Sequence, residues 1–507
     1  MTRVTCFLIA ILCFHGVAFA AVRPNFVLII IDDMAWNGTP VRMDDDVPNS
    51  SMPLLDMPNL EKLAAQGMKF RNAYAAAPQC SPSRVAIQTG QSSPRNGFTV
   101  HLGGRSTYPQ KDPDFPYFLT TRDVALMPLK TNTSDLNLDR DEVTIAEALR
   151  PLGYTSAHFG KWHMRGHGPG DHGYAAHDGD TDNKAGNQRI PGDPKRMFSI
   201  TRRSVDFIDD QATAGKPFYL QISHYAVHEG RESLDETRNR YAHDPRIQHY
   251  YEEAGSTPEA VGRTQDPARW LAMAEDLDTT IGMVLEKLDE LGIAGNTYVI
   301  VVSDNGYRHW TADQPQPLRG TKWWLWDGGL RVPMFVRGPG IQPGSVCHTN
   351  VVHYDYLPTF VDIAGGDVGK LNNLDGVSLK PLFEGREVPP QFETRNLYFH
   401  YPHYRTSLPA SAMISGQWKV LHFYEEPNLP ILFDLAADMG ETDNVADEHP
   451  EIHRKLYAQM TAYLKQVGAR IPAPNPNYDP ERLETWYRED KKRLKDKEGK
   501  DEWRPFL

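Results

Sequence analysis

Two apolar runs rich in β-branched residues, at 25–31 and 297–303, each end at a pair of side chains with oxygen donors. The pairs are Asp32 with Asp33 and Asp304 with Asn305. Carboxylate and amide oxygens are ligands for a hard cation, so we expect calcium or magnesium rather than zinc. One such pair could simply cap the loop that follows it. Two pairs at equivalent positions favour a shared metal site.

The most specific spacing in the chain begins at Cys80, where Cys-Ser-Pro-Ser-Arg is followed after four residues by Thr89 and Gly90. A proline in the first turn predicts a helix that begins here. The N–H groups of that turn and the guanidinium of Arg84 would then lie beside residue 80, where an anion would bind. Because the formal net charge of the chain is −12, such an anion site has to be a local basic pocket.

Two further apolar runs, at 154–159 and 218–223, end at lysine or histidine residues. A single lysine or histidine is usually a surface residue or a satisfied core residue. Here the position at strand ends favours a functional role, because the carboxyl ends of parallel strands meet at one edge of a sheet. The candidates are Lys161, His163 and His228, with His224 as the alternative to His228.

These side chains have to be positioned by the elements around them. The four apolar runs are short and continuous, which is typical of strands buried on both faces of a parallel sheet. Helical patterns lie between them, at 58–67, 143–153 and 267–292. The alternation predicts an α/β protein with a large, doubly wound, mostly parallel sheet. Ligands of such sheets bind at the carboxyl ends of the strands, where all four polar clusters lie.

The pattern changes after about residue 381. Short strand-like segments at 412–420 and 429–435 precede a helical pattern at 450–467, which predicts a smaller C-terminal α+β domain with a short antiparallel sheet. The last segment is rich in proline and charge, which is typical of a solvated tail or a surface helix. The expected organisation is a signal peptide at 1–20, a main domain at 21–385, the C-terminal domain at 386–471 and a charged tail at 472–507.

The first twenty residues have the features of a secretory signal peptide. Arg3 precedes an apolar run at 6–13, and residues 18–20 have the small-x-small pattern that a signal peptidase cleaves. The alternative is an uncleaved membrane anchor, but the run is shorter than the ~20 residues that span a bilayer. We expect a secreted or periplasmic protein without a membrane span.

Composition and cysteine content exclude several classes of protein. With 40% hydrophobic and 24% charged residues, the chain of 507 residues is a folded protein rather than a disordered one. The negative net charge and the lack of a long basic run argue against nucleic acid as a partner. Only Cys80 and Cys347 follow the signal peptide, so a disulfide framework is excluded and a single bridge stays open. The oligomeric state is not indicated.

The order of these motifs resembles that of the type I sulfatases, in the alkaline-phosphatase superfamily. The segment from Cys80 matches their C-x-P-S-R followed by T-G, and residues 160–163 match their G-K-W-H. Residues 322–333 match a lysine followed by E-G-G-x-R-V-P, and residues 433–444 are similar to the pattern of the family's C-terminal domain. The resemblance covers nearly the whole chain after the signal peptide, and it implies an arylsulfatase-like sulfuric ester hydrolase.

In this family the motif cysteine is oxidised after translation, so the resemblance implies a formylglycine at residue 80. It also implies a partner, a formylglycine-generating or anaerobic maturation enzyme. One hydroxyl of the hydrated aldehyde would attack sulfur, and the other would later expel sulfate and regenerate the aldehyde. A serine would instead leave a stable sulfate ester. The implied calcium ligands are Asp32, Asp33, Cys80 in its modified form, Asp304 and Asn305.

The resemblance implies roles for the basic side chains as well. Arg84, Lys161 and Lys322 would face the charge that develops on the sulfate oxygens. His228, alone or with Lys322, would donate a proton to the leaving oxygen, and His163 would help to break the sulfated intermediate. The implied catalytic residues are Cys80, Arg84, Lys161, His163, His228 and Lys322.

The sequence departs from the family pattern at a few positions. His228 is preceded by Val and followed by Glu, where many members read P-H-T-P, and His224 therefore stays open as a core or supporting histidine. Asp327 replaces the usual glutamate, and residues 439–440 replace a proline. None of the replaced residues is catalytic in the family, so the departures bear on the subfamily rather than on the chemistry.

The substrate is the least determined feature. We expect an O-sulfated carbohydrate attacked at a chain end, because a secreted enzyme meets sulfated polysaccharides more often than aryl sulfates. Residues 172–183 resemble a variable substrate-side loop of the family, although a structural loop capped by its own carboxylates is the alternative. The tryptophans at 323, 324 and 326 form either a packed cluster or a wall on which sugars stack.

Two other functions stay open. One is a phosphonate monoester or phosphodiester hydrolase on the same scaffold, with the same modified residue. The other is a non-catalytic glycan-binding protein that has kept the fold, against which the complete set of implied catalytic residues argues.

Overall fold

The computed structural model describes residues 23–100, 127–130, 134–135, 137–253, 255–263, 266–307, 317–404 and 407–482. The predicted signal peptide and the predicted tail beyond residue 482 lie outside the described residues. Within the described ranges, no helix combines the length and the apolar character needed to cross a bilayer.

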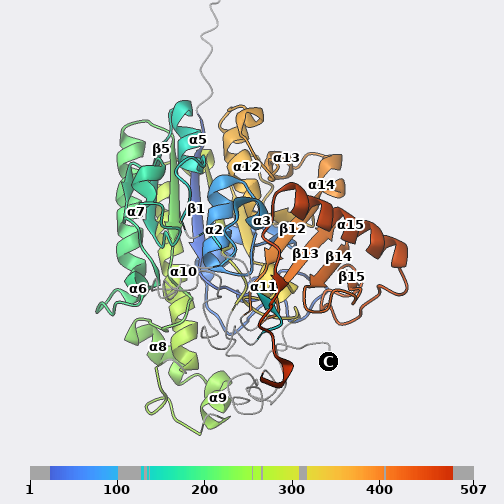
Figure 1. The fold of residues 1–507 in the computed structure, drawn as a ribbon. Coiled ribbons are helices and arrows are strands. Elements are labelled where there is room, and N and C mark those ends of the chain that lie inside the picture. The colour runs from blue at the N-terminus through green and yellow to red at the C-terminus, as the bar shows by residue number, and fades with distance from the viewer. Residues whose placement is uncertain are drawn as a thin grey trace, which may run out of the picture.

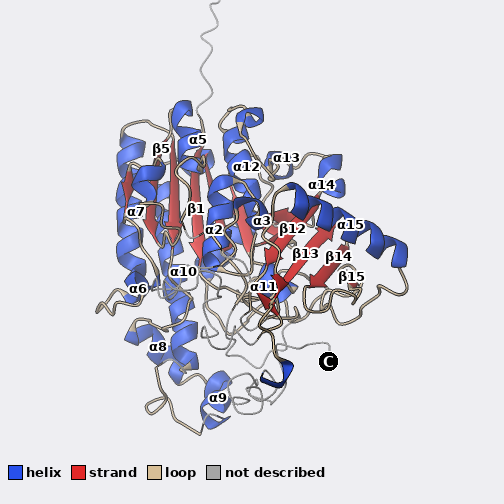
Figure 2. Cartoon of the chain, viewed as in Figure 1, coloured by secondary structure: helices blue, strands red, loops and turns tan. Residues whose placement is uncertain are grey.

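A sheet of eight strands forms the centre of the main domain, in the order β10-β2-β9-β8-β1-β7-β5-β6 (Figures 1 and 2). Only β9 runs antiparallel to its neighbours among these eight strands. This confirms the predicted α/β class with a mostly parallel sheet. The bounds are β1 Asn25–Ile31, β2 Met68–Phe70, β5 Thr155–Gly160, β6 Ala176–His177, β7 Phe218–Ser223, β8 Thr297–Ser303, β9 Met334–Arg337 and β10 Ser345–Cys347.

Helices cover both faces of this sheet, as the doubly wound arrangement requires (Figure 1). The helices against one face are α1 Pro58–Gln66, α7 Met197–Thr213 and α10 Pro267–Glu290. Those against the other are α2 Cys80–Thr89, α5 Ile145–Leu149, α12 Tyr356–Ile363 and α13 Lys380–Phe383. Further α-helices in the described part of the main domain are α3 Ser93–Asn96, α6 Asn183–Gly186, α8 Asp235–Ala242, α9 Gln248–Glu253 and α11 Asp327–Leu330.

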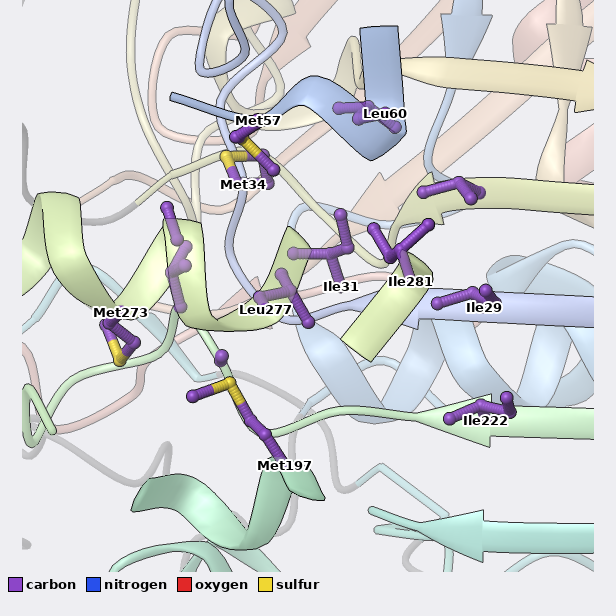
Figure 3. Close-up of a cluster of buried hydrophobic side chains, with 14 of the residues drawn as sticks. Ile29, Ile31, Met34, Met57, Leu60, Met197, Ile222, Met273, Leu277 and Ile281 are labelled. Atoms are coloured by element: carbon purple, nitrogen blue, oxygen red, sulfur yellow. The ribbon is translucent and has the colours of Figure 1, made fainter. Parts of the chain in front are cut away.

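The unbroken apolar sequence of β1 follows from this two-sided burial. Because successive side chains of a strand point to opposite faces, Ile29 and Ile31 face one hydrophobic core, whereas Leu28 and Ile30 face the other. Figure 3 shows Leu277 and Ile281 of α10 beside the first pair. Full burial of one such side chain stabilises the fold by roughly 1.5–3 kcal/mol. The core thereby fixes the strand ends that carry the polar residues.

The C-terminal part forms a four-stranded antiparallel sheet in the order β12-β13-β14-β15. Its helix α15, Pro450–Gln466, packs Leu456, Met460 and Leu464 against one face of this sheet. This confirms the smaller α+β unit, while its predicted boundaries stay predictions. The strands are β12 Asn396–Tyr401, β13 Ala410–Ser415, β14 Trp418–Phe423 and β15 Leu432–Asp434, and a short helix α14, Pro390–Thr394, precedes them.

The other face of this small sheet packs on the main domain. The three tryptophans at 323, 324 and 326 are buried there, and the ring of Trp326 contacts those of Phe423 and Phe433. They are therefore a packed cluster rather than a sugar-stacking wall.

Short strands tie further segments to the main domain. The first residues of the predicted tail form β16, Ala473–Pro474, which is exposed but pairs with β4, Leu129–Lys130, so this part of the tail is attached to the main domain. A second two-stranded sheet joins β3, Ala73–Tyr74, to β11, Val351–Val352. Both described cysteines, Cys80 and Cys347, are buried and free, so the single bridge that the sequence left open is not formed.

Candidate active site

The four predicted oxygen ligands meet at the carboxyl ends of β1 and β8. These two strands pair in parallel with Ile31 opposite Ser303, so the residues that follow them come together. Asp33 adopts a left-handed conformation, with φ of 64°, and its N–H donates to Asp304 Oδ1 at 3.2 Å. Such a conformation costs roughly 1–3 kcal/mol in a non-glycine residue and is typical of functional sites. Asp32, Asp33, Asp304 and Asn305 are all buried.

The arrangement fits a cation. Asp32, Asp33, Cys80 and Asp304 each place a ligand atom within 4.8 Å of the others. Within the described part of the chain, Asp33 Oδ2 and Asn305 Oδ1 are buried oxygens without a hydrogen-bond partner. Buried polar atoms are rarely left unpaired, because each costs about 1–3 kcal/mol. Two unpaired oxygens on adjacent strand ends are donors of the kind that a hard divalent cation prefers.

Cys80 is the first residue of α2 and lies against this acidic group. Its Sγ is 3.4 Å from Asp32 Oδ1, and Lys322 Nζ approaches the sulfur to 3.0 Å. Burial raises the pKa of the Cys80 thiol to about 12, although Lys161 and Lys322 oppose this shift. The unmodified thiol is therefore protonated at neutral pH and is a poor nucleophile.

Three cations surround the carboxylates. Lys161 Nζ donates to Asp32 Oδ2 at 2.5 Å, and Lys322 Nζ donates to Asp33 Oδ1. Arg84 donates from Nη2 and Nε to Asp304 Oδ2, at 2.7 and 2.9 Å, and from Nη1 to the main-chain oxygen of Lys161 at 2.8 Å. Its guanidinium thus holds a candidate metal ligand and the main chain of the G-K-W-H segment. We name the site cluster as Asp32, Asp33, Asp304, Arg84, Lys161 and Lys322.

Two of the candidate histidines lie at the site. His163 Nδ1 is 3.2 Å from Ser81 Oγ, next to Cys80, and His228 Nε2 is 3.8 Å from Asp33 Oδ2. Burial lowers the pKa of His228 to about 3, an effect that Asp33 opposes. His224 instead lies near α10, with Nε2 3.5 Å from Thr280 Oγ1. The structure therefore favours His228 over His224.

The polar groups of the loop at 172–183 mainly bond to neighbouring main-chain groups of the protein. His172 is buried and lies 3.0 Å from the main-chain oxygen of Gly166, and Asp178 accepts from the N–H of Gly160. The hydroxyl of Thr181 donates to the carbonyl oxygen of the same Gly160. These contacts support the structural alternative for this loop, which fixes the end of β5 beside Lys161.

Sequence reasoning missed Lys195, a buried lysine in the turn before α7. Its Nζ donates to the main-chain oxygen of Glu229, the residue after His228, at 2.6 Å. The turn is polar and carries no motif, so nothing in the sequence indicates that its lysine enters the interior. The residue types around Lys195 do not predict its left-handed conformation either.

An α/β sheet of this topology, with an oxygen-rich acidic group at its strand ends and the cysteine of α2 and two lysines beside that group, is the arrangement of a hydrolase of the alkaline-phosphatase-like fold. The family model described as "Sulfatase" matches residues 24–366, more than half of the chain, and "N-sulphoglucosamine sulphohydrolase, C-terminal" matches residues 321–469. The chain belongs to the sulfatase family. It is a sulfuric ester hydrolase.

Curated relatives and solved structures agree with this assignment. N-acetylgalactosamine-6-sulfatase of Homo sapiens is 29% identical over 90% of this chain and 88% of its own. Steryl-sulfatase of Rattus norvegicus is 26% identical over 89% of this chain and 90% of its own. The crystal structure of Ps i-CgsB in complex with k-i-k-neocarrahexaose shares 21% identity and a TM-score of 0.67, covering 92% of this chain and 97% of that one. At this identity the structural likeness shows the fold alone.

Proposed function

We propose that this sulfatase removes O-sulfate groups from a sulfated carbohydrate, using a formylglycine made from Cys80 and a bound calcium ion. The observation that carries the proposal is the position of Cys80, between Lys322 and an acidic group that has two unpaired oxygens. The relative named N-acetylgalactosamine-6-sulfatase and the structure solved with a neocarrahexaose support a sugar substrate. The relative named steryl-sulfatase, at nearly the same identity, supplies the competing substrate class.

Charge balance supports an anionic substrate. The site cluster contains three carboxylates and three cations, which cancel, so a divalent ion would leave the site with a net charge of about +2. The residues that would hold the ion are Asp32, Asp33, residue 80, Asp304 and Asn305. Bound there, calcium would supply a positive charge that polarises the sulfate oxygens. A sulfate monoester, with one negative charge, suits such a pocket.

The remaining side chains divide the chemistry between them. Lys161 and Lys322 lie closest to the reacting group and would stabilise the charge that develops on the sulfate oxygens. Arg84 would act by orienting Asp304, to which it donates two hydrogen bonds. His228, whose side chain is 14% exposed, would protonate the leaving oxygen. His163 would serve the breakdown of the sulfated intermediate.

The low pKa of His228 without substrate does not oppose its role as a proton donor. Burial is the main cause of the shift, and an anionic sulfate beside the ring would favour the protonated form. Lys322 is the second candidate for the proton donor. Maturation by a formylglycine-generating or anaerobic enzyme, export by the N-terminal signal peptide and a secreted or periplasmic location complete the proposal.

Two measurements test the proposal. Mass spectrometry of the peptide that contains residue 80 should show the loss of sulfur and the gain of an aldehyde, and an unmodified cysteine in active protein would overturn it. Sulfate release should then be measured on a panel of mono- and oligosaccharide sulfates, an aryl sulfate, a steroid sulfate and an aryl phosphodiester. Turnover confined to the aryl or steroid sulfate, or faster turnover of the phosphodiester, would refute the sugar assignment.

A further inference from the structure

Lys195 is a buried cation that the proposed reaction leaves without a role. Its Nζ donates to the carbonyl oxygen of Glu229 at 2.6 Å and to Asn187 Oδ1 at 2.8 Å, and the residue is 1% exposed. Burying an ammonium group is costly unless hydrogen bonds compensate for lost water. A leucine or methionine could fill the same volume without that cost. The charge of Lys195 therefore has to be explained by the groups that accept hydrogen bonds from its Nζ.

The backbone at Lys195 is held in an uncommon conformation. Both Lys195 and Arg196 are left-handed, with φ of 52° and 56°. Such conformations persist only where the surrounding structure enforces them. Here Asp193 accepts hydrogen bonds from the N–H groups of Phe198 and Ser199 and so fixes the turn at the start of α7. The turn directs the lysine side chain toward the loop after β7.

The Glu229 carbonyl oxygen accepts a hydrogen bond from Lys195 and is also contacted by the ring of His228. His228 Nδ1 lies 3.4 Å from this oxygen, and because a carbonyl only accepts, Nδ1 carries the proton in that contact. The other ring nitrogen, Nε2, is then the one that faces Asp33 and the site. Gly230 packs closely on the ammonium group of Lys195, since a Cβ added at this glycine would lie 3.2 Å from Lys195 Nζ. Lys195 thus holds the peptide that orients the imidazole.

We propose that Lys195 is a positioning residue for His228, which keeps Nε2 directed at the leaving oxygen of the substrate. The inference rests on the proposed function of His228. When the bond between sulfur and the leaving oxygen breaks, that oxygen keeps the electron pair and takes the Nε2 proton of the doubly protonated ring, which keeps its Nδ1 proton on the Glu229 carbonyl. A sugar alkoxide is a strong base and depends on this proton, whereas 4-nitrophenolate is a weak base and leaves without it.

A comparison of substrates with different leaving groups therefore distinguishes a loss of His228 positioning from a general loss of structure. In Lys195→Met, we expect kcat for the best sugar sulfate of the panel to fall about 10–100-fold, because positioned proton transfer contributes on the order of 10²–10⁴-fold. On 4-nitrophenyl sulfate the fall should stay below about threefold, with little change in KM, since the same variant still binds the sulfate. Lys184→Met, at an exposed lysine on α6, is the matched control and should behave as wild type.

Two further variants keep the test decisive. Asn187→Ala removes the other hydrogen-bond acceptor of Lys195 and lies at an exposed position, so it can be tested even if Lys195→Met does not fold. It should show the same dependence on the leaving group, with a smaller loss of kcat. Lys195→Arg retains a donor for the Glu229 carbonyl and should recover part of the lost kcat on the sugar sulfate. In His228→Ala, adding Lys195→Met should cause no further loss, because the two residues act as one unit.

An equal loss on both substrates, a loss expressed in KM alone, or full additivity with His228→Ala would overturn the positioning role. Failure of the proposed function gives a different result, in which the wild type itself releases no sulfate from the sugar sulfates.

Discussion

Two buried groups of charged residues in this protein use the same chemistry to different ends. The site cluster lies at the strand ends of the main sheet. The second group, the junction cluster, consists of Asp327 and Arg331 of the main domain and Lys419 and Glu441 of the C-terminal part, all at most 1% exposed. Each group balances its carboxylates with an equal number of cations. Charge and burial alone therefore do not tell them apart.

The difference lies in the polar atoms that remain unpaired. In the junction cluster, Lys419 Nζ is 2.7 Å from Asp327 Oδ1 and 2.6 Å from Glu441 Oε1. Arg331 Nη2 donates to Asp327 Oδ2 at 2.7 Å, and the N–H of Asp327 donates to Glu441 Oε2 at 2.6 Å. Each of the four carboxylate oxygens lies within 2.7 Å of a nitrogen of the cluster, although Glu441 Oε1 is held by its ion pair with Lys419 and not by a hydrogen bond. The cluster is therefore closed by its own cations and joins the two domains. In the site cluster, Asp33 Oδ2 has an ion-pair contact only at 3.8 Å, with His228 Nε2, and the neighbouring Asn305 Oδ1 has no hydrogen-bond partner among the described residues, so these two oxygens are available to a ligand.

The largest expected effect is the loss of the reacting group. Cys80→Ala should lower kcat by about 10³-fold or more, because the proposed nucleophile disappears. The midpoint of thermal unfolding should change little. Cys347→Ala, at the other buried free cysteine, is the matched control and should keep its activity. Near wild-type turnover by the Cys80→Ala variant would contradict the proposed mechanism.

Calcium should distinguish the open cluster from the closed one. Adding calcium to chelated wild type should restore activity and raise the unfolding midpoint, since a ligand that binds only the folded state stabilises it. At a concentration of about 100 times Kd the gain is about 2.7 kcal/mol. Asp304→Ala should abolish both responses. Zinc at full occupancy in the purified protein, or full activity after complete chelation, would contradict the assignment.

Breaking the closed cluster should affect stability instead of metal binding. Lys419→Met leaves Asp327 and Glu441 buried without their shared cation, which should cost about 3–5 kcal/mol of unfolding free energy. Calorimetry should show the lowered midpoint, and the shift on adding calcium should persist. Lys370→Met, at an exposed lysine, serves as the control. Loss of the calcium response in Lys419→Met would mean that the two clusters are coupled.

The smallest expected effect is on the pH dependence of stability. Burial, reinforced by Asp327 and opposed by Lys419, raises the pKa of Glu441 above its ordinary value of 4.5. The folded state then holds the proton more tightly than the unfolded state, so unfolding free energy falls as pH rises above that value, until the folded carboxyl ionises too. Glu441→Gln should flatten this fall, because the amide does not titrate. Parallel curves for variant and wild type between about pH 5 and pH 7.5 would refute the shift.

Much of the site could be predicted from the sequence because its residues follow strands or sit in short motifs. Asp32 and Asp304 meet since parallel strands bring their carboxyl ends to one edge, whatever the details of packing. Cys80 and Arg84 share one turn of α2, so their proximity is local. The alternation of β1 between two cores likewise follows from the period of two in a strand. The sequence by itself therefore determined the α/β class and predicts the identity of the reacting group.

Only the tertiary structure decided the questions that depend on contacts between distant segments. The sequence predicts His228 and leaves His224 open as the alternative, and the loop after β7 carries the first to Asp33 and leaves the second against α10. The tryptophan at 326 is buried because the small sheet packs on it. The inward turn of Lys195 depends on a left-handed backbone and on a carbonyl 34 residues away. Such choices are set by strand register and loop geometry, which residue types alone do not encode.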